Sequence, residues 1–336
     1  MRTAQDALVI DDLTMRFPVG RRHIFSPSKR TVLTALDRVS FVLSPGETLG
    51  IVGESGSGKS TLARIVAGLV DASEGEVRLG ATELEAKRDR ELSRRVQMVF
   101  QDPVSSLNPR VSVGSMLAEV LKVHRLVTPA GMRARLEELM AMVELPVSTL
   151  DRRPRSMSGG QRQRVGIARA LALQPDVLIL DEAIAALDVS VQASVLQVLR
   201  RLQRELGFSM IFISHDLGAV RGLCEAVAVM YLGRIVEVGP VDLVLRSPAH
   251  PYTRALIASE LNIDAPRAPG HSGLKGEPPS PIDRPTGCAF RQRCPIARPD
   301  CAAAEPPIDM TAMHDAACFY SDPADRPGTH VEGAHV

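Results

Sequence analysis

A glycine-rich loop at residues 53–61 has the composition of a phosphate-binding site. The segment GESGSGKST follows the pattern G-x-x-x-x-G-K-[ST] and ends on Lys59, Ser60 and Thr61. Glycines let backbone N–H groups turn toward phosphate oxygens, the lysine reaches the β- and γ-phosphates, and the serine hydroxyl binds Mg²⁺. The sequence therefore predicts a nucleoside triphosphate site. The expected contact residues are Gly53, Glu54, Ser55, Gly56, Ser57, Gly58, Lys59, Ser60 and Thr61.

Two acidic residues follow a strongly apolar run. Residues 177–180 are all apolar, which favours a strand buried on both faces, and Asp181 and Glu182 come directly after it. Such acids also occur as simple N-caps of the next helix. Beside a phosphate loop, we expect Asp181 to hold Mg²⁺ together with Ser60 and Glu182 to accept a proton from the attacking water.

The segments around these residues alternate between strand-like and helix-like patterns. This alternation predicts an α/β fold with a mostly parallel sheet, helices on both faces and a small antiparallel layer at the start. A proline-containing helical block from about 103 to 156 interrupts it, which predicts an inserted helical subdomain. Strand-like runs are 8–17, 38–43, 75–79, 96–100, 177–181, 209–213 and 225–231, and helix-like runs are 60–69, 112–123, 131–143, 159–173, 190–206 and 216–222.

Composition limits the partners and the compartment. The chain has 336 residues, enough for about two domains. Its net charge of +1 supplies no basic surface for bulk nucleic-acid binding. No apolar run approaches the roughly 20 residues needed to cross a bilayer, and the N-terminus lacks a signal-peptide core. We therefore expect a cytosolic protein unless a partner tethers it to a membrane.

The cysteines are unevenly distributed. Four of the five lie near the C-terminus with the spacing C-x5-C-x6-C-x16-C, namely Cys288, Cys294, Cys301 and Cys318. In a reducing compartment such a cluster favours a metal or iron–sulfur site over disulfides, although the spacing matches no common zinc or ferredoxin pattern. An iron–sulfur cluster, a zinc ion with His314 as a spare ligand, and plain thiols all remain open. We expect a structural role for this segment, separate from nucleotide binding, and a buried apolar role for Cys224.

Residues 157–164 read MSGGQRQR and open a predicted helix. A hydroxyl, two glycines and free N–H groups at a helix N-terminus form an anion site, although they also suit an ordinary capping turn. The motif resembles the signature of ATP-binding-cassette ATPases, with Met157 where the family usually has Leu. The resemblance implies that two chains enclose two ATP molecules. The residues it places at the interface are Ser158, Gly159, Gly160, Gln161 and Asp188.

The same resemblance assigns three further residues. Gln101 matches the glutamine that touches Mg²⁺ and the attacking water. His215 matches the histidine that contacts the γ-phosphate, although a histidine after a strand is more often structural. Phe17 stands where the family places an aromatic ring on adenine, with Phe25 or a plain core position as alternatives.

The loop before Asp188 departs from the family pattern. The family usually has Pro at position 183 and Ser at 185, and both are Ala here. A missing hydroxyl removes a hydrogen bond near the dimer interface, worth about 1 kcal/mol. We expect a hydrolytically competent site, and the departure leaves open how efficiently the two ATP sites communicate.

Longer stretches resemble the ATPase subunits of oligopeptide and dipeptide importers. They are residues 100–110, 228–237 and 250–256 and the cysteine segment from Gly287. The resemblance implies a nucleotide-binding domain over 1–255 and a C-terminal extension over 256–336. It also implies ATP and Mg²⁺, a possible 4Fe–4S cluster, a paralogous second ATPase subunit, two membrane permeases, a solute-binding protein acting indirectly, no nucleic acid, and a peripheral place on the cytoplasmic face of the membrane.

Other functions built on the same cassette remain alternatives. The solute could be nickel, glutathione or a sugar instead of a peptide. A chromosome-maintenance or DNA-repair ATPase needs a long coiled coil or a DNA-binding insert between Lys59 and Ser158, where only 98 residues lie and no sustained heptads occur. A translation ATPase carries two cassettes in one chain, whereas this chain has one.

Overall fold

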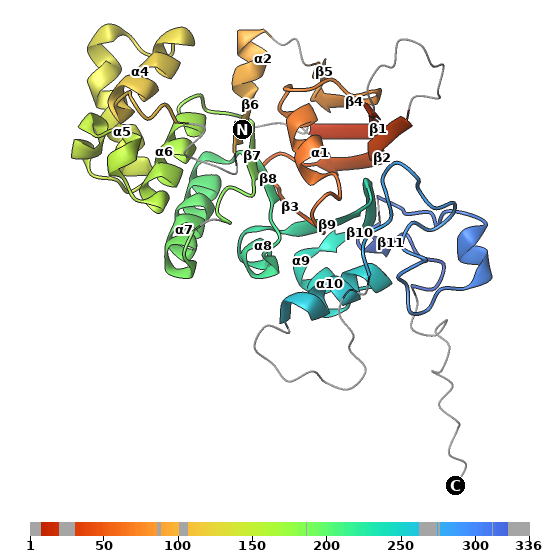
Figure 1. The fold of residues 1–336 in the computed structure, drawn as a ribbon. Helices are drawn as coiled ribbons and strands as arrows, with labels where there is room; N and C mark the ends of the chain where they lie inside the picture. Colours follow the sequence, from red (N-terminus) through yellow and green to blue (C-terminus); the bar gives the residue numbers. More distant parts are fainter. Residues whose placement is uncertain are drawn as a thin grey trace.

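The computed structural model describes residues 8–19, 31–85, 89–100, 107–185, 187–261, 274, 276–310 and 312–321. Two sheets organise this part of the chain (Figure 1). The larger has seven strands: β3 (Thr48–Val52), β6 (Val96–Val99), β7 (Val177–Asp181), β8 (Ser209–Ile213), β9 (Ala226–Tyr231), β10 (Arg234–Pro240) and β11 (Asp315–Ala316). The smaller has four: β1 (Leu8–Val19), β2 (Thr31–Leu43), β4 (Glu74–Leu79) and β5 (Thr82–Glu83).

The larger sheet has the strand order β11-β10-β9-β3-β8-β7-β6. Strands β9, β3, β8, β7 and β6 run parallel, and β10 and β11 are antiparallel additions at one edge. Parallel neighbours end at the same edge of a sheet, where ligands bind in such folds. The chain that leaves β3, β7 and β8 therefore emerges on one side of the molecule, and the predicted parallel sheet is confirmed.

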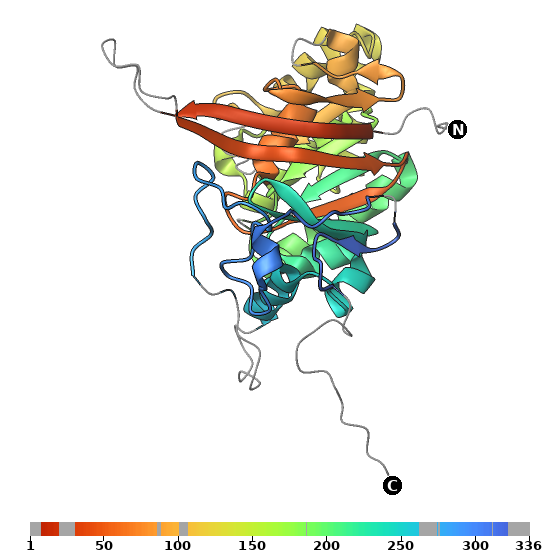
Figure 2. The same ribbon diagram turned by 90° about the vertical axis from the view of Figure 1, so that its right-hand side faces the viewer.

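The smaller sheet has the order β2-β1-β4-β5 and is antiparallel throughout. Its apolar side chains pack with α1 (Lys59–Val66) and one face of the larger sheet into a single buried cluster. Figure 2 shows β1 and β2 lying side by side above the blue C-terminal segment. The predicted antiparallel layer is therefore present, and it covers the face of the larger sheet on which α1 lies.

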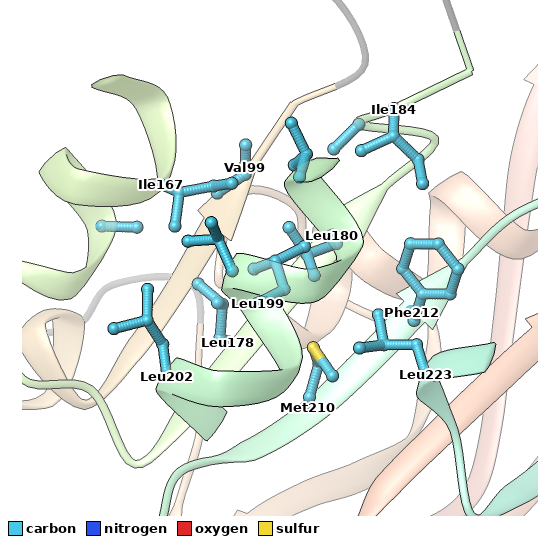
Figure 3. Packing of buried hydrophobic residues seen from close by; sticks show 14 of the residues in the cluster. Val99, Ile167, Leu178, Leu180, Ile184, Leu199, Leu202, Met210, Phe212 and Leu223 are labelled. Carbon is cyan, nitrogen blue, oxygen red and sulfur yellow. The ribbon is translucent and has the colours of Figure 1, made fainter. Parts of the chain in front are cut away.

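Every residue from Val177 to Leu180 in strand β7 is apolar because the strand is buried on both faces of the sheet. Val177 and Ile179 face the cluster under the antiparallel layer, whereas Leu178 and Leu180 face a second cluster. Both pairs are fully buried. Figure 3 shows Leu178 and Leu180 packed with side chains of β8 and of helix α7 (Val189–Leu206), which covers that face together with α6 (Gly159–Leu171) and α8 (Leu217–Leu223).

A block of helices occupies most of the predicted insertion. It contains α4 (Val113–Val123), η2 (Pro129–Gly131), α5 (Met132–Met142), η3 (Val147–Asp151) and η4 (Pro154–Ser156). Ser112 caps α4 by accepting a hydrogen bond from the Ser115 N–H. The block leads directly into α6, and Figure 1 shows it at the end of the molecule farthest from the C-terminal segment. The helical character predicted for this stretch is confirmed over its described part.

The C-terminal segment is joined to the larger sheet. After β10 come α9 (Val241–Arg246) and α10 (Pro251–Leu261), and the later described segment contains η5 (Pro299–Ala302) and β11. Strand β11 pairs with β10 through Glu237 opposite Ala316, and the Thr34 N–H donates to the Pro281 carbonyl at 3.1 Å. The sequence patterns missed α2 (Arg90–Arg95), β5, β10, α9, α10 and β11. None of the helices in the described part of the chain combines the length and the apolar character that a membrane span requires.

Candidate functional site

The glycine-rich loop follows β3 and turns into α1. Gly53 has φ 148° and Gly58 has φ 108°, values that side chains disfavour. A Cβ on Gly53 would lie 2.1 Å from the Met230 carbonyl oxygen, and one on Gly58 would lie 2.5 Å from that of Ala35. Both glycines are therefore required by conformation and by close backbone contacts, as a phosphate-cradling loop demands.

The Lys59 ammonium is held inside this loop. Its Nζ donates to the Gly53 carbonyl at 2.7 Å and to the Glu54 carbonyl at 2.9 Å, and the residue is 5% exposed. Burial lowers the pKa of Lys59, while nearby carboxylates, that of Glu182 first, act in the opposite direction. The loop thus keeps a buried cation next to backbone carbonyls, where it can turn to phosphate oxygens.

Ser60 and Asp181 meet at the end of the sheet. The Ser60 hydroxyl donates to the Asp181 carboxylate at 3.0 Å. Asp181 is 5% exposed, and burial raises the pKa of its carboxyl, although the Ser60 hydrogen bond acts against that shift. A hydroxyl and a carboxylate at this separation fit Mg²⁺, which takes oxygen ligands and usually binds through one or two carboxylates plus substrate phosphates. The predicted pair is therefore brought together.

Glu182 adopts a left-handed backbone conformation with φ 47°. Such a conformation costs a non-glycine residue about 1–3 kcal/mol and is concentrated at functional sites. The Glu182 N–H donates to the Ile213 carbonyl at the end of β8, at 3.0 Å, which holds the turn in place. His215 follows two residues after Ile213 and is exposed. The ends of β7 and β8 thus carry Glu182 and His215 to the same edge of the sheet.

The signature segment begins α6 and lies against α7. Ser158 caps the helix: its hydroxyl accepts from the Gln161 N–H at 3.3 Å and its N–H donates to the Gln161 side chain at 3.2 Å. The capping turn is therefore present. A Cβ on Gly160 would lie 2.4 Å from Val191 Cγ1, and one on Gly159 would lie 3.2 Å from Leu187. Ser158 and Asp188 are both exposed, so this surface is open to another molecule.

The remaining predicted residues are placed as follows. Gln101 and Phe25 lie outside the described residues. Phe17 stands on β1 opposite Leu33 and is 36% exposed, so it is not a core side chain. Ala183 is buried and Ala185 is exposed beside the start of α7. Cys224 is 6% exposed, and burial raises its pKa, in agreement with an apolar role.

The four C-terminal cysteines lie around one cavity. Cys288, Cys294, Cys301 and Cys318 line it, and its volume is about 10 Å³, enough for one water molecule. The Cys288 N–H donates to the Cys301 carbonyl at 2.8 Å. Burial raises the pKa of Cys288, and it raises that of Cys294 to about 11. Among the described residues, no group of three or more His, Cys, Asp or Glu side chains is arranged to hold a metal ion.

Two residues that the sequence patterns missed contact the phosphate loop. The Tyr252 hydroxyl accepts from the Glu54 N–H at 2.8 Å, and the Arg293 guanidinium binds the Glu54 carboxylate at 2.6 and 2.9 Å. Arg293 belongs to the C-terminal segment, so that segment contacts the phosphate loop, and its expected separation from nucleotide binding stays a prediction. The only available signal was that both residues lie in stretches resembling peptide-importer ATPases.

Comparisons with known proteins agree with this geometry. Residues 36–185 match the family model described as ABC transporter, and residues 236–301 match that described as oligopeptide/dipeptide transporter, C-terminal region. The oligopeptide transport ATP-binding protein OppF of Salmonella typhimurium is 46% identical over 324 residues, covering 94% of this chain and 96% of that protein. A probable peptide ABC transporter ATP-binding protein of Sinorhizobium fredii, y4tS, is also 46% identical over 324 residues, covering 95% and 91%.

Solved structures of ATP-binding cassettes have the same fold. The dimeric, post-hydrolysis cassette MJ0796 bound to ADP and phosphate has a TM-score of 0.60 at 27% identity, covering 70% of this chain and 98% of that one. The cbiO1 subunit of a Clostridium perfringens ABC transporter has a TM-score of 0.61 at 27% identity, covering 77% and 96%. The phosphate loop, the acidic strand end and the signature helix therefore lie in a known cassette architecture, and the chain belongs to the oligopeptide/dipeptide family of ABC transporter ATP-binding subunits, which are ATPases.

Proposed function

We propose that this chain hydrolyses ATP to power the import of oligopeptides or dipeptides. The observation that carries the proposal is the family match over residues 236–301, the region specific to oligopeptide and dipeptide transporters. Relatives 46% identical over nearly the whole chain are named as oligopeptide transport ATP-binding proteins, which supports the same solute class. The Ser60–Asp181 contact supports Mg²⁺-dependent hydrolysis.

The residues divide into two half-sites. Lys59 and the loop N–H groups bind the β- and γ-phosphates of ATP, and Ser60, Asp181 and Gln101 hold Mg²⁺. Glu182 takes a proton from the attacking water while the water oxygen bonds to the γ-phosphorus and the bond from that phosphorus to the β,γ-bridging oxygen breaks. His215 contacts the γ-phosphate. Phe17 stacks on adenine. The other half-site consists of Ser158, Gly159, Gly160, Gln161 and Asp188, which face the ATP of a second chain.

The assembly follows from this division. Residues 1–255 form the nucleotide-binding domain, with the helical subdomain at about 103–156, and residues 256–336 form the extension. The second chain is a paralogous ATPase subunit. Both bind two membrane permeases on the cytoplasmic face, and a solute-binding protein delivers the peptide from the other side.

Transport of defined solutes tests the proposed class. The chain, co-purified with its permeases and reconstituted in vesicles with the cognate binding protein, is expected to accumulate a labelled di- or oligopeptide only when ATP is supplied. ATP hydrolysis should rise when the peptide-loaded binding protein is added. Uptake of nickel, glutathione or a sugar in place of peptide, measured in the same vesicles, would overturn the peptide assignment while leaving the ATPase assignment intact.

We also propose that the four C-terminal cysteines bind a 4Fe–4S cluster. The support is that all four line one cavity and that thiolates are the ligands such clusters take. A single zinc ion is the alternative ligand, and no group arranged to hold a metal ion occurs among the described residues, so either site would need the cysteines to move. The cavity of about 10 Å³ must widen, so binding requires the thiols to lose protons and move apart.

Anaerobic purification tests the cluster directly. The protein is expected to be brown, to absorb near 400 nm as iron–sulfur proteins do, and to contain iron and acid-labile sulfide. Replacing Cys288, Cys294, Cys301 or Cys318 by Ser should remove the iron, whereas Cys224→Ser, which changes a buried cysteine away from the cavity, should not. Colourless protein without iron, sulfide or zinc would leave these cysteines as ordinary thiols.

A further inference from the structure

Three aromatic side chains from separate parts of the chain form a cluster beneath the phosphate loop. They are Tyr231 at the end of β9, Tyr252 at the start of α10, and Phe290 in the cysteine segment. The ring centroids of Tyr231 and Tyr252 lie 4.6 Å apart, and that of Phe290 lies 5.3 and 5.4 Å from them. All three are at most 2% exposed. Aromatic residues make up only 3% of the chain, so three of them in contact are a notable cluster. We call these three side chains the aromatic junction, because they join β9, α10 and the cysteine segment.

Glu54 of the phosphate loop is held to this junction at two points. Its backbone N–H donates to the Tyr252 hydroxyl, and its carboxylate accepts two hydrogen bonds from Arg293: Nη1 to Oε2 at 2.6 Å and Nη2 to Oε1 at 2.9 Å. The Arg293 side chain is only 5% exposed and that of Glu54 is 23% exposed. Such parallel, charge-assisted pairs fix orientation as well as position.

The position of Arg293 is set by the cysteine segment. Its backbone N–H donates to the Phe290 carbonyl at 2.9 Å, and its guanidinium carbon lies 5.8 Å from the Tyr231 ring centroid and 5.9 Å from that of Phe290. Cys294 is the next residue. A shift of this segment would therefore move the guanidinium relative to Glu54.

Other contacts already attach the C-terminal segment to the body of the protein. Arg284 forms an ion pair with Asp37 at 3.0 Å, Arg38 pairs with Glu305, and β11 pairs with β10. The Arg293–Glu54 pair is therefore not needed for attachment. Its particular effect is electrostatic, because it neutralises a carboxylate that belongs to a loop built to receive a triphosphate. An unpaired Glu54 carboxylate in that half-buried place would repel the phosphates.

We propose that Arg293 is a positioning residue for ATP binding. From the C-terminal extension, Arg293 neutralises Glu54 and orients the phosphate loop. The ATP affinity of this subunit then depends on the position of the C-terminal extension, a segment that follows the nucleotide-binding domain. The inference rests on the ATPase activity and not on the proposed solute or cluster, so it can fail or hold independently of both.

A pair of substitutions separates this role from a purely structural one. Arg293→Gln in the full chain is expected to weaken binding of a fluorescent ATP analogue by about tenfold, within the usual range of coupling between sites. In the reconstituted transporter KM for ATP should rise with kcat unchanged, because the lost interaction serves binding. The double variant Glu54→Gln/Arg293→Gln should recover most of the affinity, since no unpaired carboxylate remains.

Two further variants serve as controls. Arg291→Gln removes the same charge two residues away, where the side chain reaches Thr286 at 3.5 Å, and it should leave ATP affinity unchanged. Arg293→Lys keeps the charge but lacks the planar fork that pairs with both carboxylate oxygens, so it should lose some affinity, though less than Arg293→Gln. It also keeps the test open if the Gln variant fails to fold.

Unchanged ATP affinity in Arg293→Gln would overturn the proposal. So would a double variant as weak as Arg293→Gln alone, because that result would mean that Arg293 only supports the fold. An equal loss in Arg291→Gln would have the same consequence, since it would show a general disturbance of the segment.

Discussion

Replacing Glu182 by Gln is expected to lower ATP turnover by about 10²–10⁴-fold, the usual effect of losing a general base. The amide has nearly the shape of the carboxylate but cannot take the proton of the attacking water. The backbone of Glu182 is held by its hydrogen bond to the Ile213 carbonyl, so the side chain should keep its place. Binding should persist, because the proposed phosphate contacts are made by Lys59 and the loop N–H groups and do not involve this side chain.

The same variant should accumulate in an ATP-bound dimer. In the proposed two-chain arrangement, closure would need ATP at both sites and reopening would need hydrolysis, so blocking the chemical step should trap the closed state. Turnover of the reconstituted complex and the size of the ATP-bound pair in gel filtration measure the two effects. Turnover equal to that of the unchanged protein would remove Glu182 from the mechanism.

The second large effect concerns two residues that are expected to serve different nucleotides. Lys59→Ala should weaken ATP binding to the isolated chain, because the buried ammonium in the phosphate loop is lost. Ser158→Arg should leave that binding intact and abolish closure of the dimer and hydrolysis. The physical reason is that Ser158 lies exposed at the start of α6, against α7, where a bulky cation would block a partner's γ-phosphate.

Binding and closure are measured separately. ATP affinity of the isolated subunit reports on the phosphate loop, and formation of the nucleotide-bound pair reports on the interface. Thr149 in η3 is buried and its hydroxyl makes no hydrogen bond to the described residues, so Thr149→Val nearly keeps the volume and should spare both properties as a control. If Ser158→Arg abolishes binding in the monomer, the two-chain site is wrong.

The local patterns determined the chemistry of this protein. The loop from Gly53 to Thr61 depends on a few neighbouring residues, so its spacing indicates a phosphate site, and that site in turn favours a catalytic role for the acids after β7. The turn at Ser158 is an anion site or a capping turn by its residues, and its place at a two-chain interface is what the family resemblance implies. The continuous apolar run of β7 likewise predicted a strand buried on both faces, because no polar residue interrupts it. Residues such as Gln101 and Phe17 could be assigned only by resemblance, and their roles stay predictions.

Only the tertiary structure decided how the C-terminal segment relates to the nucleotide site. Its weak periodicity concealed α10 and β11. Strand β11 forms because it pairs with β10, which is distant in the sequence, and not because of local preference. The ion pair between Arg293 and Glu54 likewise joins residues 239 positions apart, and nothing in the spacing of either segment specifies its partner. Such a contact exists because the aromatic junction of Tyr231, Tyr252 and Phe290 brings the two segments together, and packing of that kind is a property of the folded chain as a whole.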